Sequence, residues 1–425
     1  MSAPHGVNPA WRRALVFWLG AIATGAVAVL FAWASDGALS LQQRFAAASA
    51  WWSWLAPPLS LALVAWLTSR FFNGAQGSGV PQTIAALSLT SMEARNRLLS
   101  LRIASGKLLL TLVALFGGAS VGREGPTVQI GASIMHALNR FAKFRSVDVD
   151  RGLILAGGAA GIAAAFNTPL AGIVFAIEEL SRSFEERTSG NILTAVILAG
   201  ITSMALLGNY TYFGATQALL DTPRMWLAVP VCGLVGGFAG GLFARVLLVL
   251  GDGLPGRCGL WQRRWPIGFA LVLGLVLALI GWLAHGDTFG TGYPQARGLI
   301  LQTAQPVPGY VLLKALATLT SYLAGIPGGI FAPSLAVGAA LGGELSPWLT
   351  VAPAGVVTLL TMAAYFSGVV QAPLTALVIV GEMTGNHGLT LPLMAVVLLG
   401  RGASATVCSR SLYRGLAERY LKGAP

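Results

Sequence analysis

The feature of this sequence that most constrains its fold is a motif that occurs twice within strongly apolar sequence. Residues 122–132 and residues 329–339 both follow the pattern G-x-x-x-P-[S/T]-x-x-x-G-A, and the two prolines lie 207 residues apart. A second pair follows them, because residues 167–171 (NTPLA) and residues 371–375 (QAPLT) carry prolines that lie 204 residues apart. Two matches at nearly the same offset indicate a duplicated unit of about 200 residues, an organisation that is common in membrane transporters.

The composition indicates a polytopic membrane protein. Of the 425 residues, 55% are hydrophobic and 10% are charged, whereas about 25% of the residues of a soluble domain are charged. Within residues 315–400, Glu344 and Glu382 are the only charged side chains. No soluble fold of this size buries so much apolar sequence, so we expect helices that span a lipid bilayer.

The formal net charge of +12 has two explanations. Lys and Arg concentrate in the cytoplasmic loops of membrane proteins, and a basic surface also attracts anions. Arg12 and Arg13 flank one apolar segment and Arg263 and Arg264 flank another, which favours the first explanation as the main cause. We expect no nucleic-acid partner, because no basic segment belongs to a soluble domain.

The cysteines and histidines predict neither a metal site nor a disulfide framework. Cys232, Cys258 and Cys408 are far apart, and the four histidines lack the spacing of metal ligands. We therefore expect no metal and no cofactor. The first apolar run, residues 14–34, has 21 residues and is interpreted as a retained membrane helix, because a signal peptide has an apolar region of about 7–15 residues.

The apolar segments fall into two groups. Four of them are long enough to cross a bilayer: residues 14–34, 51–69, 225–244 and 266–284. Four others are short or interrupted: residues 108–121, 153–177, 315–343 and 345–381. Broken segments at matching places in two halves mark the binding site of a transporter. We predict one transmembrane domain, residues 1–425, with a first repeat half at residues 10–220 and a second at residues 221–425. Separately, we interpret residues 245–265 as a link between halves, although these bounds place that stretch inside the second half.

The duplicated motif predicts an anion site. Residues 122–126 (GREGP) precede a predicted helix at 127–138, and residues 329–333 (GIFAP) precede a predicted helix at 334–341. Proline is favoured at the first helical position, and glycine lets a ligand approach the backbone. The start of a helix offers unpaired N–H groups and a partial positive charge, which together bind anions.

With these motifs the chain resembles the CLC family of chloride channels and chloride/proton antiporters. Residues 77–81 (GSGVP) match the family motif GSGIP with Val for Ile, residues 122–126 match GREGP, and residues 329–333 match GxFxP. Tyr413 supplies the tyrosine that the family carries near its C-terminus. The resemblance covers essentially the whole chain and is that of a prokaryotic-type member without an appended CBS domain. It implies an all-α fold of two inverted-topology repeats with broken and tilted helices.

The resemblance also implies a set of chloride ligands. The hydroxyl groups of Ser78 and Tyr413 and the backbone N–H groups of Ile330 and Phe331 would bind the central chloride. Relatives that prefer nitrate tend to carry proline at the position of Ser78, and fluoride exporters depart from the serine and tyrosine pattern. The retained hydroxyls therefore favour chloride.

Two glutamates take proton-linked roles by the same resemblance. Glu124 would be the gating glutamate, and Glu179 would relay protons from the cytoplasmic side. The repeat aligns Glu178, not Glu179, with Glu382, so we interpret Glu178 and Glu382 as structural. The presence of both Glu124 and Glu179 favours an antiporter over a channel, which is the main alternative.

The resemblance further implies a homodimer in a lipid bilayer, in which each subunit has its own pore for chloride and protons. We expect a transporter rather than an enzyme, located as a multi-pass protein in a bacterial inner (plasma) membrane. A remote alternative is an intramembrane serine hydrolase. Residues 118–122 fit the pattern G-x-S-x-G around Ser120, and His136 lies downstream.

Overall fold

The computed structural model describes residues 10–142, 147–181, 186–208, 211–214, 218–304 and 308–422, and this part of the chain is almost entirely helical. The helices of the first half are α1 (Ala10–Ala48), α2 (Ala50–Phe71), α3 (Val80–Ser88), α4 (Met92–Asn96), α5 (Leu101–Phe116), α6 (Glu124–Ala142), α7 (Val147–Phe166), α8 (Pro169–Phe175), the π-helix η1 (Ala176–Ser181) and α9 (Glu186–Leu207). Those of the second half are η2 (Met225–Leu227), α10 (Ala228–Gly251), α11 (Gly256–Arg264), α12 (Pro266–Leu283), α13 (Tyr293–Ile300), α14 (Tyr310–Leu323), α15 (Phe331–Leu345), α16 (Ala354–Val370), α17 (Pro373–Thr384), η3 (His387–Leu389), α18 (Thr390–Val407) and α19 (Leu412–Lys422). No strand occurs in the described ranges, which hold only two isolated β-bridges.

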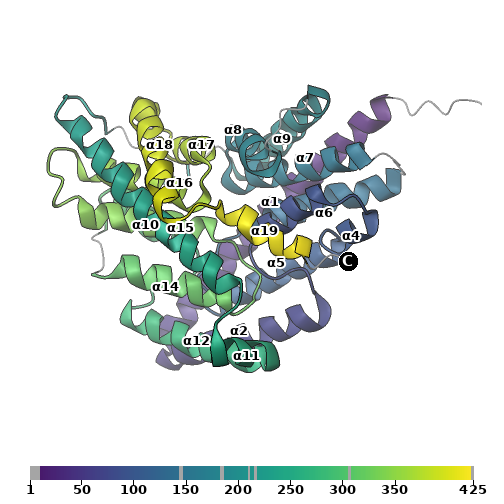
Figure 1. Cartoon of the computed structure of the whole chain (residues 1–425), viewed down its shortest axis with the longest axis horizontal. Coiled ribbons are helices and arrows are strands. Elements are labelled where there is room, and N and C mark those ends of the chain that lie inside the picture. The colour runs from purple at the N-terminus through teal and green to yellow at the C-terminus, as the bar shows by residue number, and fades with distance from the viewer. Residues whose placement is uncertain are drawn as a thin grey trace, which may run out of the picture.

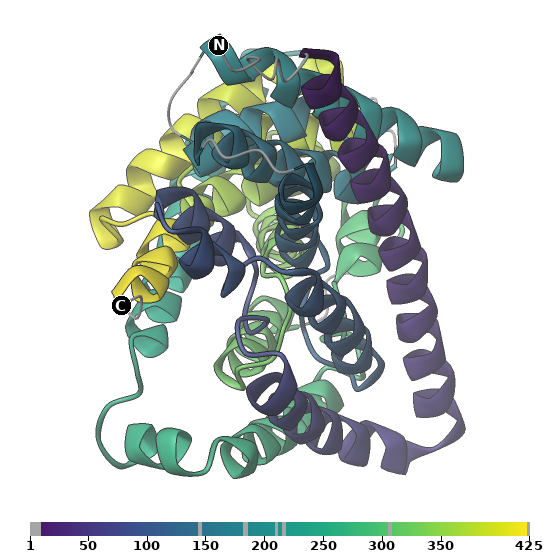
Figure 2. The same cartoon turned by 90° about the vertical axis from the view of Figure 1, so that its right-hand side faces the viewer.

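The chain is a multi-pass membrane protein by the length and apolar character of its helices. Seven helical segments among the described residues are long and apolar enough to cross a bilayer. The four predicted long spans coincide with helices, and the last of them extends one residue past the end of α12. Helix α1 is much longer than the predicted span and runs from Ala10 to Ala48. In Figure 2, α1 follows one edge of the molecule along most of its height.

The interpretation of residues 245–265 as a link is wrong in part. Helix α10 continues to Gly251, and α11 occupies Gly256–Arg264, so only a short turn joins them. The extra turns of α10 form because Leu247 remains fully buried while Arg245 lies at the surface. The predicted interruptions are confirmed, since breaks separate α5 from α6, α7 from α8, α14 from α15 and α16 from α17.

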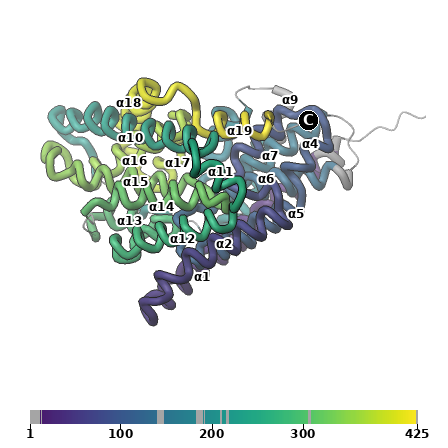
Figure 3. The backbone as a smooth tube through the Cα atoms, turned by 60° about the horizontal axis from the view of Figure 1, so that its bottom comes forward, coloured from purple at the N-terminus to yellow at the C-terminus, as the bar shows by residue number. Residues whose placement is uncertain are grey.

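The packing of the helices repeats along the chain. Helix α1 packs on α7 and α9, and α10 packs on α16 and α18 in the same way. Helices α6 and α7 form a pair that corresponds to α15 and α16, and the contact of α2 with α5 corresponds to that of α12 with α14. Figure 1 shows α10, α16 and α18 in one group and α6, α7 and α9 in the other. Figure 3 shows α12 beside α2, the contact that joins the two groups along one edge.

Glycines allow the paired helices to approach closely. A Cβ atom at Gly131 of α6 would lie 2.3 Å from the carbonyl oxygen of Gly157 of α7, and a Cβ atom at Gly157 would lie 2.3 Å from that of Gly131. In the second half, a Cβ atom at Gly342 of α15 would lie 2.5 Å from the Cα atom of Thr358 of α16. Such small residues bring membrane helices into backbone contact, where van der Waals packing replaces the hydrophobic effect.

Candidate functional site

The breaks between helices meet at one place in the interior. Gly122 donates its N–H to the carbonyl oxygen of Gly329 at 2.7 Å, and Gly329 returns the same bond to Gly122 at 2.7 Å. The loop at residues 77–79 joins them, because Gly77 bonds with Ile326 and Gly328 at 3.0 and 3.1 Å. This pair is an isolated antiparallel β-bridge between equivalent positions of the duplicated motif, as a two-fold relation between the repeats requires.

Both helices of the duplicated motif begin earlier than predicted. The first helical residue of α6 is Glu124 and that of α15 is Phe331, so the proline stands third in each helix rather than before it. The prediction was wrong in this detail because proline is tolerated anywhere in the first turn, where its missing N–H would have no helical acceptor. The starts of α6 and α15 lie side by side, since Gly122 and Gly329 are bonded.

The Glu124 side chain lies at the start of the opposite helix. Its carboxylate is fully buried and lies close to the backbone N–H groups of Glu124 itself and of Ala332, while its Oε2 atom accepts no described hydrogen bond. Ala332 is the second residue of α15. The carboxylate of the first half thus occupies the positively polarised end of a helix in the second half. Its Oε1 atom also accepts a hydrogen bond from the Tyr293 hydroxyl at 2.8 Å.

Arg123 is directed away from this site. Its guanidinium donates to the carbonyl oxygen of Ala32 at 2.6 Å, to the Asp36 carboxylate at 2.7 Å and to the Tyr212 hydroxyl at 2.6 Å. These bonds tie the loop before α6 to α1. The guanidinium hydrogen bonds are therefore made elsewhere, although its charge still acts on the Glu124 carboxylate. The described side-chain donor to that carboxylate is the uncharged Tyr293 hydroxyl.

Two buried hydroxyl groups lie beside the helix starts. Ser78 and Tyr413 are 1% and 0% exposed, their hydroxyls lie close together, and neither oxygen has a hydrogen-bond partner within the described ranges. The Tyr413 ring stacks on Phe331 with centroids 5.3 Å apart. A Cβ atom at Gly125 would lie 2.3 Å from the Ser78 Oγ atom, so glycine permits this approach. Ile330 is the residue immediately before α15 and is also buried.

Glu178 and Glu382 bind helix ends in a reciprocal way. The Glu178 carboxylate accepts backbone N–H groups of Leu374 and Thr375 at 3.2 and 2.7 Å, at the start of α17. The Glu382 carboxylate accepts those of Leu170 and Ala171 at 3.4 and 2.8 Å, at the start of α8. Each half therefore caps a helix of the other. This geometry agrees with a structural role for both carboxylates.

Glu179 has a different environment from its neighbour. It lies in the π-helix η1 and is 2% exposed. Its carboxylate accepts a bond from the Ser411 hydroxyl at 3.5 Å, and Arg414 donates to its carbonyl oxygen at 3.3 Å. The Glu179 charge also acts on the Tyr413 hydroxyl. Consecutive side chains of a helix point in clearly different directions, so Glu178 and Glu179 meet different partners. Turns of the π type are frequent at functional sites.

Comparisons with known proteins identify the family of this chain. The family described as "Voltage gated chloride channel" matches residues 59–405. The chain belongs to this family. It is 32% identical over 377 residues to the H(+)/Cl(-) exchange transporter ClcA of Yersinia pestis, covering 84% of this chain and 75% of the relative. It is 31% identical over 398 residues to the protein of the same name from Vibrio vulnificus, covering 87% of this chain and 80% of the relative.

Solved structures of the family have the same fold. A slow cyanobacterial Cl−/H+ antiporter superposes with a TM-score of 0.80 at 25% identity, covering 98% of this chain and 99% of that chain. A CLC-type fluoride/proton antiporter superposes with a TM-score of 0.78 at 25% identity, covering 95% and 97%. The all-α fold of two inverted-topology repeats with broken helices is therefore confirmed.

The hydrolase alternative is wrong for this family member. The Ser120 hydroxyl is paired with the Thr318 hydroxyl at 3.0 Å, and its backbone N–H bonds with Ser321. His136 instead bonds with Asp150 at 2.8 Å and with Asn96 at 3.0 Å. A nucleophile must be within hydrogen-bond reach of its base, and these two residues have other partners.

Tyr293 is a contact of Glu124 that the sequence analysis missed, although the sequence carries a signal for it. Residues 290–294 (GTGYP) repeat residues 77–81 (GSGVP) at an offset of 213. Two buried lysines support these loops in the same way. Lys107 donates to Ala75 and Gly77 carbonyls at 2.7 and 2.8 Å, and Lys314 donates to Thr288 and Gly290 carbonyls at 2.9 and 2.8 Å.

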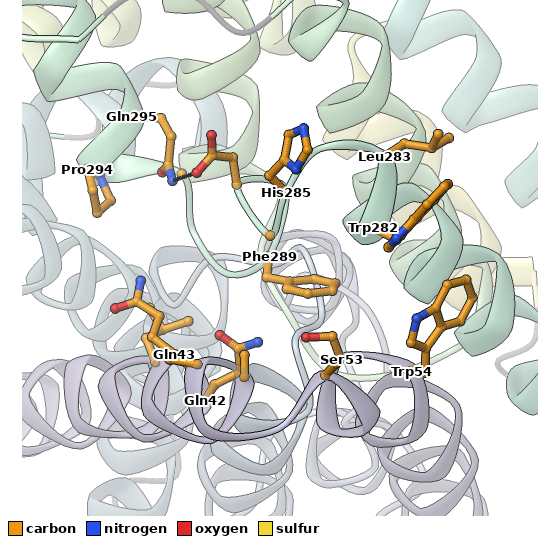
Figure 4. A pocket seen from close by; sticks show the side chains of 18 of the residues that line it. Gln42, Gln43, Ser53, Trp54, Trp282, Leu283, His285, Phe289, Pro294 and Gln295 are labelled. Carbon is orange, nitrogen blue, oxygen red and sulfur yellow. Dashed lines mark hydrogen bonds between the residues drawn. The ribbon is translucent and has the colours of Figure 1, made fainter.

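Two cavities border the loops that carry Tyr293 and Ser78. One of about 800 Å³ lies between the ends of α1 and α12 and the loop before α13. Figure 4 shows Gln42 and Gln43 on one side of it and Pro294 and Gln295 on the other. The second, of about 640 Å³, is lined by Arg70, Arg97, Arg102, Gln76 and Tyr420 among others. This basic cavity lies next to the loop that carries Ser78 and is suited to attract anions.

Proposed function

We propose that this protein exchanges chloride for protons across the membrane. The observation that carries the proposal is the Glu124 carboxylate at the N-terminus of α15, close to Ala332 and beside two buried, unpartnered hydroxyls. The relatives are named as H(+)/Cl(-) exchange transporters and one matching structure as a Cl−/H+ antiporter, which supports antiport rather than channel conduction.

Chloride would bind between Ser78 and Tyr413, with the N–H groups of Ile330 and Phe331 as further donors. Moving a monovalent ion into a dry interior costs on the order of 20 kcal/mol in the idealised limit. One helix end carries about half a charge and returns about 2 kcal/mol at roughly 4 Å with an effective dielectric constant near 20. Direct N–H and O–H bonds must therefore contribute most of the stabilisation. Uncharged donors also let the ion leave, as throughput requires.

Glu124 would couple the two ions by competition. An ionised carboxylate at the start of α15 is itself an anion and occupies a position that favours chloride. Protonation removes the negative charge and frees this position for chloride. An ionisable residue within the membrane is costly and is therefore rarely accidental. One side chain thus links proton occupancy with chloride occupancy.

Glu179 would pass protons toward Glu124 from the cytoplasmic side. Its carboxylate acts on Tyr413, and Tyr413 in turn interacts with Glu124, so the tyrosine lies in the electrostatic field of both carboxylates. We further propose that residues 10–220 and 221–425 are the two repeats of one domain. The assembly would be a homodimer with one pore per subunit, and its location the inner membrane of a bacterium.

The test is transport by the purified protein in liposomes. A chloride gradient imposed across the membrane should drive protons uphill, and fluoride should substitute poorly for chloride. Chloride movement without proton movement would indicate a channel and would overturn antiport.

A further inference from the structure

The Tyr293 hydroxyl is the one side-chain group with a described hydrogen bond to the Glu124 carboxylate, at 2.8 Å from Oε1. Tyr293 is the first residue of α13 and is 9% exposed. Both partners come from different halves of the chain and are removed from water. A hydrogen bond to an ionised acceptor is about twice as strong as one between neutral groups.

Its surroundings fix the position of Tyr293. The centroid of the Tyr293 ring lies 5.0 Å from the ring centroid of Tyr212 and 5.7 Å from that of Phe213. The preceding backbone turns through Gly290 and Gly292, whose φ angles of 71° and 84° other residues rarely adopt. The Lys314 ammonium holds this loop through the Gly290 carbonyl at 2.8 Å. The hydroxyl is therefore presented to Glu124 by a rigid support.

The same loop borders the cavity of about 800 Å³. Thr291, Gly292 and Pro294 line that cavity, and Tyr293, which stands among them in the sequence, bonds with Glu124. The cavity is formed by the C-terminal ends of α1 and α12 and by the start of α2. Four basic residues stand at the opposite ends of α1 and α12, against Arg44 near the cavity end of α1: Arg12, Arg13, Arg263 and Arg264. Because basic residues concentrate on the cytoplasmic side, the cavity belongs to the outer face.

We propose that Tyr293 is a positioning residue that holds the Glu124 carboxylate in the anion site and closes that site toward the outer cavity. The inference rests on the proposed gating role of Glu124. The hydroxyl stabilises the ionised, site-occupying carboxylate, and its removal favours the protonated, displaced form. The titratable and charged groups that act on Glu124 from the surrounding elements are Arg123, Tyr293 and Tyr413. Of these, Tyr293 alone donates a described side-chain hydrogen bond to it.

The variant Tyr293→Phe tests this role by removing one oxygen atom. In liposomes, its chloride flux should be several-fold faster than wild type at neutral pH. The half-maximal pH of transport should move upward by about one unit, which corresponds to a tenfold change in the protonation equilibrium. The matched control is Tyr310→Phe, because Tyr310 is also buried and donates to the Asp287 carbonyl oxygen at 3.4 Å rather than to Glu124.

The double variant Tyr293→Phe, Glu124→Gln separates this inference from the proposed function. If Tyr293 acts through Glu124, the double variant transports like Glu124→Gln alone. An unchanged pH profile in Tyr293→Phe, or an equal shift in the double variant, overturns the inference while leaving the gating role intact. Retained proton coupling in Glu124→Gln overturns the gating role itself. Calorimetric chloride binding in detergent, measured against pH, gives the same comparison if a variant does not reconstitute.

Discussion

The starts of α6 and α15 share one backbone design but differ at the same position. Glu124 and Phe331 are each the first helical residue, two positions before the proline of the duplicated motif. Glu124 places a carboxylate at the opposite helix, whereas Phe331 packs against Tyr413 and Phe366 with centroids 5.3 and 5.1 Å apart. The two repeats thus have equivalent helix ends, and only the first carries a titratable side chain at this position. The start of α15 instead presents its N–H groups beside the packed rings of Phe331, Phe366 and Tyr413.

Neutralising Glu124 should have the largest effect, because it removes the carboxylate that distinguishes the two helix starts. Glu124→Gln mimics a permanently protonated carboxyl group, so chloride should still move while proton coupling and pH dependence disappear. Paired measurements of proton and chloride flux in liposomes check this result. Uphill proton pumping at the wild-type rate would show that another group couples the ions.

Glu178 and Glu179 provide a second contrast. Glu179→Gln should abolish proton movement and keep chloride movement, because the chloride ligands do not include this side chain. Glu178→Gln should leave coupling largely intact and lower stability by about 1 kcal/mol, since the carboxylate caps α17. Flux ratios and thermal unfolding of both variants distinguish the roles. If Glu178→Gln abolished proton movement and Glu179→Gln did not, the proton path would pass through Glu178.

Substitutions of Tyr413 test the start of α15, where the Tyr413 ring stacks on Phe331. Tyr413→Phe removes one hydrogen bond to an ion, at most about 1.5–3 kcal/mol of chloride binding. Tyr413→Ala also removes the ring that stacks on Phe331, so chloride should pass without its proton. Chloride affinity, measured by calorimetric titration, and proton coupling, measured by flux ratios, should both decrease from wild type to Tyr413→Phe to Tyr413→Ala. Normal chloride binding and coupling in Tyr413→Ala would mean that Tyr413 is an interfacial anchor and not a chloride ligand.

The smallest expected effect concerns the next position of the motif, Gly125 in α6 and Ala332 in α15. A Cβ atom at Gly125 would lie 2.3 Å from the Ser78 Oγ atom and 2.7 Å from its carbonyl oxygen. Gly125→Ala should therefore displace Ser78 and weaken chloride binding by about tenfold, near 1.4 kcal/mol. The matched variant Ala332→Gly should change binding little. Equal chloride titrations for Gly125→Ala and wild type would mean that the Ser78 hydroxyl is not a ligand.

Much of the architecture was predictable, because the duplicated prolines and glycines lie in apolar sequence that must break where a site forms. The motifs around Glu124 and Phe331 therefore located both helix ends. The sequence did not predict that the helices begin at these residues rather than after Pro126 and Pro333, since a proline fits any position of the first turn. Nor did it predict the extra turns of α10, which depend on tertiary burial of Leu247.

Other parts of the site depend on contacts that only the folded chain creates. Tyr293 was not predicted, because the loops at residues 77–81 and 290–294 match at an offset of 213 residues, whereas the duplicated motif repeats at an offset of 207. The separate environments of Glu178 and Glu179 depend on tertiary partners, the start of α17 for Glu178 and Ser411 for Glu179, which are distant in the sequence.

The most direct test of the central claim is to locate a heavier halide in crystals of the wild type and of Glu124→Gln. Bromide is suitable because its anomalous scattering identifies it. In the wild type at neutral pH, bromide should lie beside Ser78 and Tyr413 but not at the N–H of Ala332, which the Glu124 carboxylate faces. In Glu124→Gln, a further bromide should lie at the start of α15. The same bromide positions in both proteins would contradict competition between this carboxylate and the transported anion.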